Sequence, residues 1–172
     1  EIELIELELL SVPTELTDDD VGKVTSTIRS VSLASNKLST LPSDMYSLEA
    51  LAALDLSENN IHELPEGFVE MKNLEALYLD DNKLRNVPVD FGRLKKFRYA
   101  SLNRNRLTTF PPSIRKCKQL QVLRADNNKF IILPQTLSLC QTLQEMSFSD
   151  NSIQTVPMLF NKMKGIRKLF LE

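Results

Sequence analysis

The sequence predicts an α/β solenoid, a horseshoe of similar coils with a parallel β-sheet on the concave face and short helical, 3-10 or irregular convex segments. Three columns of residues, each with a spacing of 23, predict this fold. Apolar residues open the units at Ile28, Leu51, Leu74, Phe97, Leu120, Leu143 and Ile166. Prolines follow at Pro42, Pro65, Pro88, Pro111, Pro134 and Pro157. Asparagines lie between them at Asn36, Asn59, Asn82, Asn105, Asn128 and Asn151. One such unit cannot bury its own apolar side, so each coil needs neighbours.

The unit that begins at Leu74 illustrates the pattern, L-x-x-L-x-L-x-x-N-x-L-x-x-V-P. Its first, fourth and sixth positions are apolar because they point inward from the strand. The asparagine amide, which both donates and accepts, is expected to satisfy backbone groups that a tight buried turn leaves unpaired. Stacked coils would turn these side chains into a ladder. Proline fixes φ where the outer segment begins.

The chain is predicted to form one continuous domain with three parts. Residues 1–27 are a diverged N-terminal capping coil, residues 28–165 are six repeats, and residues 166–172 are the strand of a truncated seventh repeat. Ile2, Leu4, Leu7 and Leu9 alternate with other residues as in a strand. Residues 17–20, Thr-Asp-Asp-Asp, resemble a helix N-cap, which we favour over a metal site. Because the seventh repeat stops after its strand, we expect the natural chain to continue or another molecule to cover that edge.

Two alanines interrupt the leucine columns, at Ala100 and Ala125. We expect nearby phenylalanines to fill the missing volume, since close-packed cores tolerate exchanges that conserve volume. The residues in question are Phe97, Phe110, Phe130 and Phe148.

The composition indicates a globular protein, with 42% hydrophobic and 26% charged residues among 172. A formal net charge of −2 gives no overall attraction to nucleic acid or to anionic membranes. No apolar run reaches the length that a membrane-spanning helix needs. Two cysteines without paired clusters favour a reducing compartment. Cys117 and Cys140 occupy the same column, where buried free thiols are favoured over a disulfide and over metal binding.

These columns resemble the leucine-rich repeat family, specifically its 23-residue type with a Leu-Pro dipeptide. That type is similar to the repeats of intracellular Ras-pathway scaffolds, the Scribble group and Roco GTPase–kinases. The resemblance implies the horseshoe fold and, because no cysteine-rich cap is visible, a cytoplasmic protein. In this family the residues between the strand leucines point into the hollow of the horseshoe.

Mapped onto this sequence, the hollow is richest in binding-type side chains at the third to fifth repeats. Tyrosine and arginine are the residues most often found as interface hot spots. We therefore predict a partner-binding patch on the concave face, made of Tyr78, Tyr99, Arg104, Arg124, Asp80 and Asp126. Tyr78 and Tyr99 should touch, since parallel strands lie ~4.8 Å apart. The competing interpretation is an ordinary exposed surface on which Arg104 pairs with Asp81.

A basic ridge along the return edge is a second candidate surface, for an acidic partner or an anionic lipid. Its residues are Lys72, Arg93, Lys95, Lys96, Arg115, Lys116, Lys118, Lys162 and Lys164. A solvated face is the simpler interpretation, so membrane contact is the weaker alternative.

No catalytic constellation is apparent, and we predict neither a cofactor nor a metal. The single histidine, His62, has no nucleophile and orienting acid beside it, and four scattered glycines form no phosphate loop. The predicted function is a protein-interaction scaffold in signalling that binds a protein partner, such as a small GTPase, and no nucleic acid. The alternative is a regulatory segment of a larger enzyme, such as a Roco-type GTPase–kinase, a ubiquitin ligase or a phosphatase.

Overall fold

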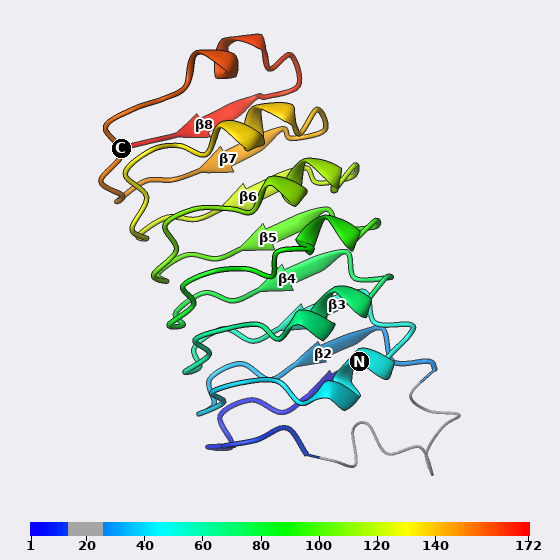
Figure 1. The fold of residues 1–172 in the computed structure, drawn as a ribbon. Coiled ribbons are helices and arrows are strands. Elements are labelled where there is room, and N and C mark those ends of the chain that lie inside the picture. Colours follow the sequence, from blue (N-terminus) through cyan, green and yellow to red (C-terminus); the bar gives the residue numbers. More distant parts are fainter. Residues whose placement is uncertain (14–25) are drawn as a thin grey trace.

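The computed structural model describes residues 1–13 and 26–172, and it confirms the predicted solenoid. Eight strands form one open parallel sheet in the order β1 to β8, so that every strand lies beside its neighbours in sequence (Figure 1). The strands are β1 (Ile2–Glu3), β2 (Ser30–Ser32), β3 (Ala53–Asp55), β4 (Ala76–Tyr78), β5 (Tyr99–Ser101), β6 (Val122–Arg124), β7 (Glu145–Ser147) and β8 (Lys168–Phe170). From β2 onward the residues that pair are 23 apart, which is the period of the sequence.

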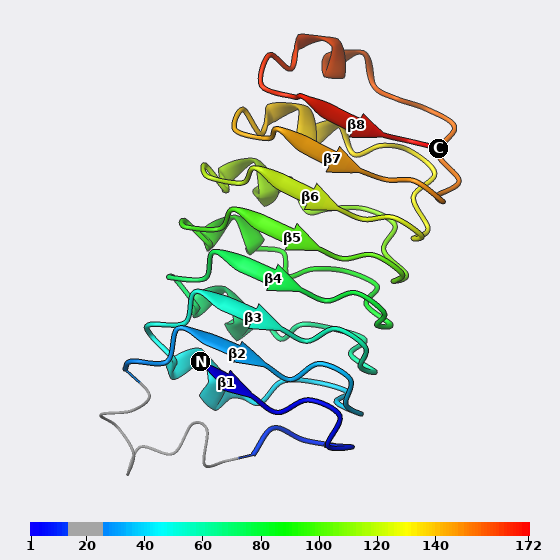
Figure 2. The ribbon, with the colours of Figure 1, turned by 180° about the vertical axis from the view of Figure 1, so that it is seen from behind.

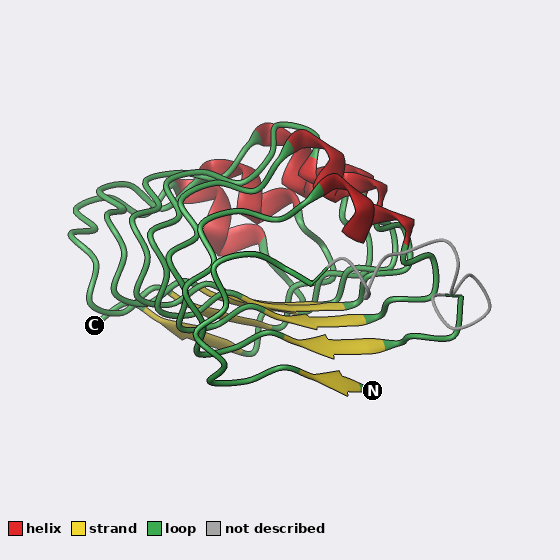
Figure 3. Cartoon of the chain, turned by 90° about the horizontal axis from the view of Figure 1, so that it is seen from below, coloured by secondary structure: helices red, strands yellow, loops and turns green. Residues whose placement is uncertain are grey.

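In the six repeats the convex side is built from 3-10 helices, one in each repeat, and they form a layer opposite the sheet (Figures 2 and 3). They are η3 (Ser43–Ser47), η4 (Glu66–Glu70), η5 (Phe91–Arg93), η6 (Pro112–Lys116), η7 (Gln135–Leu139) and η8 (Met158–Lys162). A proline with extended backbone precedes five of the six, whereas Asp90 precedes η5. The proline column therefore marks the entry into the convex segment, as its fixed φ predicts.

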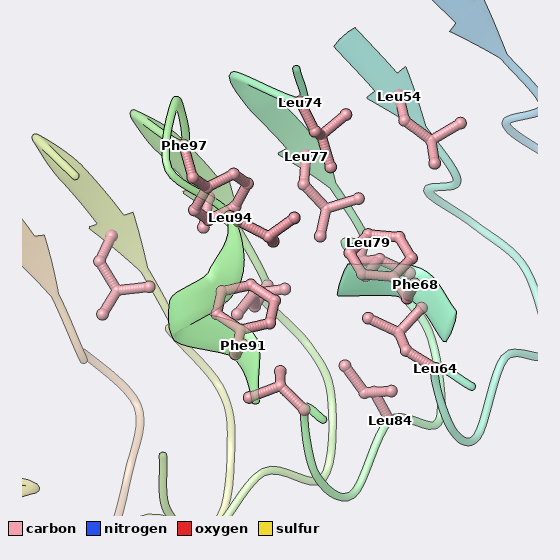
Figure 4. Close-up of a cluster of buried hydrophobic side chains, with 14 of the residues drawn as sticks. Leu54, Leu64, Phe68, Leu74, Leu77, Leu79, Leu84, Phe91, Leu94 and Phe97 are labelled. Atoms are coloured by element: carbon pink, nitrogen blue, oxygen red, sulfur yellow. The ribbon is translucent and has the colours of Figure 1, made fainter. Parts of the chain in front are cut away.

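The core lies between these two layers, and the repeat's apolar positions fill it (Figure 4). In the third repeat, Leu74, Leu77 and Leu79 are fully buried from the strand side, and Phe91 reaches them from η5. Phe68 does the same one coil earlier. Because each coil contributes the same inward set, the core is continuous along the stack, and each coil is stabilised by its neighbours.

Each strand from β2 to β7 is followed by a turn in which the eighth residue of the repeat has a left-handed backbone. These residues are Ser35, Glu58, Asp81, Arg104, Asn127 and Asp150, with φ between 51° and 56°. None is a glycine, although this conformation costs other residues free energy. The asparagine that follows offsets this cost by bridging two coils.

The asparagine side chains form a ladder along the stack. Asn82 donates to the carbonyl oxygens of Leu79 in its own coil, at 3.3 Å, and Leu56 in the preceding coil, at 2.9 Å. Its Oδ1 accepts the backbone N–H of Ile61, again in the preceding coil, at 2.9 Å. The equivalent contacts recur at the other five asparagines, and all except the partly buried Asn151 are buried. Each amide thus satisfies buried backbone groups of two coils at once.

The N-terminal coil pairs with the first repeat at a longer interval. Ile2 pairs with Val31, and the left-handed residue Glu6 donates its N–H to Ala34. In this pairing Ile2 and Val31 are 29 residues apart. Pro13 likewise precedes Pro42, its counterpart in the next coil, by 29 residues. The expected strand through Leu9 was wrong, because the backbone leaves the strand after Glu3. The predicted cap at residues 17–20 lies outside the described residues.

Aromatic side chains cluster in the part of the core that contains the two alanines. Phe110, Phe130 and Phe148 form a cluster with ring centroids 5.1–6.3 Å apart, and Phe148 occupies the same column as Ala125 one coil later. Around Ala100, Phe97 meets Phe91 edge to face at 5.2 Å. Both alanines are buried without a leucine side chain. That these phenylalanines fill the volume beside the two alanines stays a prediction.

Candidate partner-binding surface

The exposed face of the sheet carries a tyrosine pair at its centre. Tyr78 at the end of β4 and Tyr99 at the start of β5 lie diagonally across neighbouring strands, with ring centroids 5.0 Å apart and planes inclined by 39°. Both side chains are half-buried. Partial burial raises the pKa of the Tyr78 phenol, and the neighbouring Tyr99 and Asp55 add to this effect. The expected contact between the two rings is therefore present, and it makes a rigid aromatic platform.

Arg124 on β6 extends this platform toward the C-terminal end. Its guanidinium carbon lies 5.8 Å from the centroid of the Tyr99 ring, within cation–π range. Nε and Nη2 both donate to one carboxylate oxygen of Glu145, at 3.1 and 2.8 Å. The other Glu145 oxygen accepts from Lys168 at 3.2 Å. These hydrogen bonds lower the pKa of Glu145 and raise that of Arg124, so both groups stay charged.

One connected row of side chains thus crosses five consecutive strands, β4 to β8. Its members are Tyr78, Tyr99, Arg124, Glu145 and Lys168. We call this row the concave ridge. Each member is held by its neighbour, so little rotamer freedom remains to be lost on binding.

Arg104 lies outside this row, in the turn after β5. Its Nε and Nη2 make two hydrogen bonds of 2.6 Å to the two carboxylate oxygens of Asp81. The side chains of Arg104 and Asp81 are 56% and 37% exposed, so solvent screens the pair. The hydrogen bond to Asp81 raises the Arg104 pKa. The structure therefore contains the ion pair that the simpler interpretation expected.

Asp80 and Asp126 form a second ladder beside the asparagine ladder. This second ladder was not predicted from the sequence. Asp80 accepts from the Ser101 hydroxyl at 2.8 Å and from the backbone N–H of Asn103 at 2.6 Å. Asn103 in turn accepts the N–H of Asp126 at 2.9 Å. Asp126 repeats the arrangement one coil further on, with the Ser147 hydroxyl at 2.6 Å. Short acceptor side chains in one column of successive repeats were the available signal.

This second ladder corrects one detail of the predicted hollow. Ser101 and Ser147, which were expected to be open to it, are buried, with 3% and 8% of their surface exposed. Their hydroxyls are taken up by the carboxylates of the preceding coil. These two serines are therefore not part of the accessible surface of the hollow.

The charges around the concave ridge are separated along the stack. Acidic side chains gather on the second and third repeats, at Asp55, Glu58, Asp80 and Asp81. Cations predominate on the fourth to seventh repeats, at Arg98, Arg104, Arg124, Arg167 and Lys168. Tyr78 and Tyr99 lie at the boundary. A partner with complementary charge would be oriented along the solenoid axis.

The predicted basic ridge on the return edge is exposed and partly neutralised. Arg93 pairs with Glu70 at 2.6 Å, and Lys72 lies 3.9 Å from the same carboxylate. Lys95 donates to the carbonyl oxygen of Gly92 at 2.8 Å. The remaining cations are exposed, in the 3-10 helices or in the turns that follow them.

Cys117 and Cys140 are free and buried, as expected. Their thiols donate weakly to backbone carbonyl oxygens of the preceding coil, Phe91 at 3.6 Å and Ile114 at 3.7 Å. Burial raises the pKa of Cys117 to about 12 and that of Cys140 to about 11. Because the thiolate is the reactive form of cysteine, both thiols are expected to be unreactive in the folded chain.

Within residues 1–13 and 26–172, no three histidine, cysteine or acidic side chains converge in a way that would hold a metal ion. In the same residues no helix has the length and apolarity to cross a membrane. His62 lies exposed in the turn of the second repeat.

Comparisons with known proteins agree with this geometry. The family model for the leucine rich repeat matches residues 26–84. No curated protein matches the sequence. A leucine-rich repeat protein of Leptospira interrogans superposes with a TM-score of 0.79 at 24% identity, over 98% of this chain and 50% of its own. The leucine-rich repeat domain of the type III effector XopL gives 0.83 at 20% identity, over 99% and 59%.

A third similar structure is the ectodomain of a plant membrane receptor kinase from Arabidopsis thaliana in complex with Casparian strip integrity factor 2. Its TM-score is 0.77 at 24% identity, over 99% of this chain and 20% of that one. The chain thus spans between a fifth and three fifths of the length of these three relatives. At such identities the likeness establishes the fold alone. Leucine-rich repeat proteins are generally interaction modules rather than enzymes. The leucine-rich repeat model thus matches the first repeats, and the chain has the same solenoid fold as each of these structures.

Proposed function

We propose that this chain is a recognition module that binds a protein partner on its concave face. Tyr78, Tyr99 and Arg124 are the anchors. The observation that carries the proposal is the concave ridge: an aromatic pair 5.0 Å apart, extended by an arginine that Glu145 holds in place. Tyrosine and arginine anchors on rigid strands lose little entropy on binding, and they are the residue types that dominate interface energies.

Arg104, Asp80 and Asp126 have supporting roles in this proposal. Arg104 and Asp81 present an exposed, screened ion pair whose partners can exchange with charges on an incoming protein. Asp80 and Asp126 hold the backbone below the anchors through their hydrogen bonds to the next coil. Their carboxylates contribute negative charge at the rim of the platform.

We further propose a cytoplasmic signalling scaffold whose partner is a signalling protein such as a small GTPase. The Leu-Pro type of repeat and the chain's resemblance to Ras-pathway scaffolds support this. The charge separation along the hollow supports a partner with a basic and an acidic end, oriented against it.

Affinity capture from cells that express the protein tests this function. The bait variant Tyr78→Ala/Arg124→Ala removes two anchors, and Arg115→Ala/Lys116→Ala changes exposed residues of η6 on the convex side as a matched control. Each hot-spot truncation costs about 2 kcal/mol or more, so the first variant should retain its partner at least ~30-fold less well. The control should capture as the wild type does. If the anchor variant folds normally and captures its partner undiminished, the concave face is not the binding surface.

A further inference from the structure

A second hollow lies on the turn edge, between the asparagine ladder and the 3-10 helices. Its larger part has a volume of about 1010 Å³ and is formed by turn and return segments of the first four repeats. A smaller part of about 380 Å³ continues it over the fifth and sixth repeats, and the two parts share Thr109. We call the whole feature the turn-edge groove.

The turn-edge groove exposes apolar side chains that the core does not use. Val89 is 69% exposed, and Ile131 and Ile132 are 56% and 55% exposed. Pro111 and Pro112 lie between them. Packing of the solenoid does not require aliphatic residues here, because the inward positions of the same coils are already filled. Exposed apolar side chains that gather along one groove of a protein surface mark an interaction site. We call this set the apolar strip.

The backbone beneath part of this strip is fixed rather than loose. Ile132 forms a parallel bridge with Thr155 in the next coil. The Ile131 carbonyl oxygen accepts the N–H of Gln154 at 2.8 Å, and Leu133 donates to the Thr155 carbonyl oxygen at 3.1 Å. The two isoleucines are therefore presented to solvent by a rigid edge.

A row of cations flanks the apolar strip. Lys83, Arg106 and Lys129 occupy the same position in three successive repeats, and Arg85 lies beside the first of them. All four are exposed, and none takes part in an ion pair in the described part of the chain.

The charge of the groove is therefore one-sided over most of its length. The acids that line it, Glu63 and Glu66, both come from the second repeat at one end. Across the third to fifth repeats the charged lining is positive. The apolar strip runs beside these cations. A ligand that fits this surface therefore needs both negative charges and apolar groups.

We propose that the turn-edge groove binds an extended peptide segment of a partner protein that combines carboxylates with aliphatic side chains. The carboxylates pair with Lys83, Arg106 and Lys129, and the aliphatic side chains cover Val89, Ile131 and Ile132. The second to sixth repeats are four steps of ~4.8 Å apart, or about 19 Å, and an extended peptide covers this with about six residues. This surface is separate from the concave ridge, so one chain holds two partners, or one partner by two contacts.

Selection from a phage-displayed library of random octapeptides tests the proposal without assuming a sequence. The enriched peptides should carry Asp or Glu together with Leu, Ile or Val. Their affinities are then measured by fluorescence polarisation for three variants. These are Lys83→Glu/Arg106→Glu in the groove, Arg115→Glu/Lys116→Glu in η6 on the convex side with the same change in net charge, and Tyr78→Ala/Arg124→Ala on the concave ridge.

The groove variant should bind the enriched peptides at least ~10-fold less tightly, while the other two variants bind as the wild type does. Replacing the aliphatic residues of a peptide by serine should weaken it by a similar factor. The proposal is overturned if no acidic–aliphatic peptide is enriched, or if the convex variant loses as much affinity as the groove variant. It is also overturned if the concave variant alone loses binding, a result that would leave the proposed function standing. A last contrary outcome is that vesicles of phosphatidylserine and phosphatidylcholine, but no peptides, bind in a groove-dependent way.

Discussion

Replacing Asn105 by alanine should cost more stability than almost any other exchange of a polar residue in this chain. Asn105 is 5% exposed and lies in the middle of the ladder. Its amide donates to the carbonyl oxygens of Leu79 at 2.7 Å, Leu102 at 3.2 Å and Asn103 at 3.1 Å. Its Oδ1 accepts the Leu84 N–H at 2.9 Å. Alanine removes all four contacts and supplies none.

The expected loss follows from one buried group left without a partner and one that loses a donor. The N–H of Leu84 in the preceding coil has no other acceptor in the described part of the chain, whereas the Leu79 carbonyl oxygen keeps the Asn82 amide at 3.3 Å. An unsatisfied buried group costs about 1–3 kcal/mol and a lost hydrogen bond about 0.5–1.5 kcal/mol, which gives roughly 1.5–4.5 kcal/mol in all. Because these contacts couple neighbouring coils, we also expect the unfolding transition to become less cooperative.

Urea denaturation followed by circular dichroism measures this difference. Asn86→Ala is the matched control, since Asn86 is exposed and makes no side-chain hydrogen bond in the described part of the chain. The control should change the free energy of unfolding by less than about 0.5 kcal/mol. Asn151→Ala should fall between the two, because Asn151 is only partly buried. If Asn105→Ala is as stable as Asn86→Ala, the ladder does not hold the coils together.

Three further predictions concern the convex side and the concave ridge. Gly92→Ala should destabilise the fold by about 2 kcal/mol, measured by the same denaturation, because the added Cβ would lie 2.0 Å from the carbonyl oxygen of Ser113. The thiols of Cys117 and Cys140 should not react with a disulfide reagent at pH 8 in the folded protein, because burial raises their pKa to about 12 and about 11, and both should react in denaturant. Hydrogen bonds from Arg124 and Lys168 lower the pKa of Glu145 in the folded protein. The ionised Glu145 therefore stabilises the fold above the ordinary carboxyl pKa of ~4.3, and this stabilisation is lost as the pH falls through the lower pKa of the folded protein. The stability difference between wild type and Glu145→Gln should accordingly be present at pH 7 and disappear in acid.

Each of these results can go the other way. A fully stable Gly92→Ala variant would mean that η5 and η6 are not as close as the structure has them. Thiols that stay silent in denaturant would indicate a disulfide between the two cysteines. A Glu145→Gln difference that grows as the pH falls would contradict the assigned direction of the pKa shift.

The period of the solenoid and the positions that point into its core could be predicted from the sequence, because each depends on a residue type that recurs. Leucine at three positions, one asparagine and one proline are enough to set strand, turn and convex segment. The first coil was harder to predict. Pro13 stands 29 residues before Pro42, and Leu7 occupies the place that asparagine has in later coils. The interval and the residue type both change there.

The candidate site was predictable in part. The contact between Tyr78 and Tyr99 followed from strand spacing, and the pair of Arg104 with Asp81 followed from the shared column. The link from Arg124 to Glu145 was not foreseen, because it depends on the rotamer of a long side chain. The turn-edge groove was also missed, since its cations and its apolar strip lie in different columns and meet only after the coils stack.

The most direct test of the central claim is a photo-crosslinking experiment that reports where the partner lies. A benzophenone-bearing phenylalanine analogue is placed at Tyr78 in one protein and at Lys116 of η6, on the convex side, in another, and both are irradiated with the captured partner. We predict a crosslinked product from position 78 and none from position 116. A product from position 116 alone would show that the partner docks on the opposite side of the solenoid.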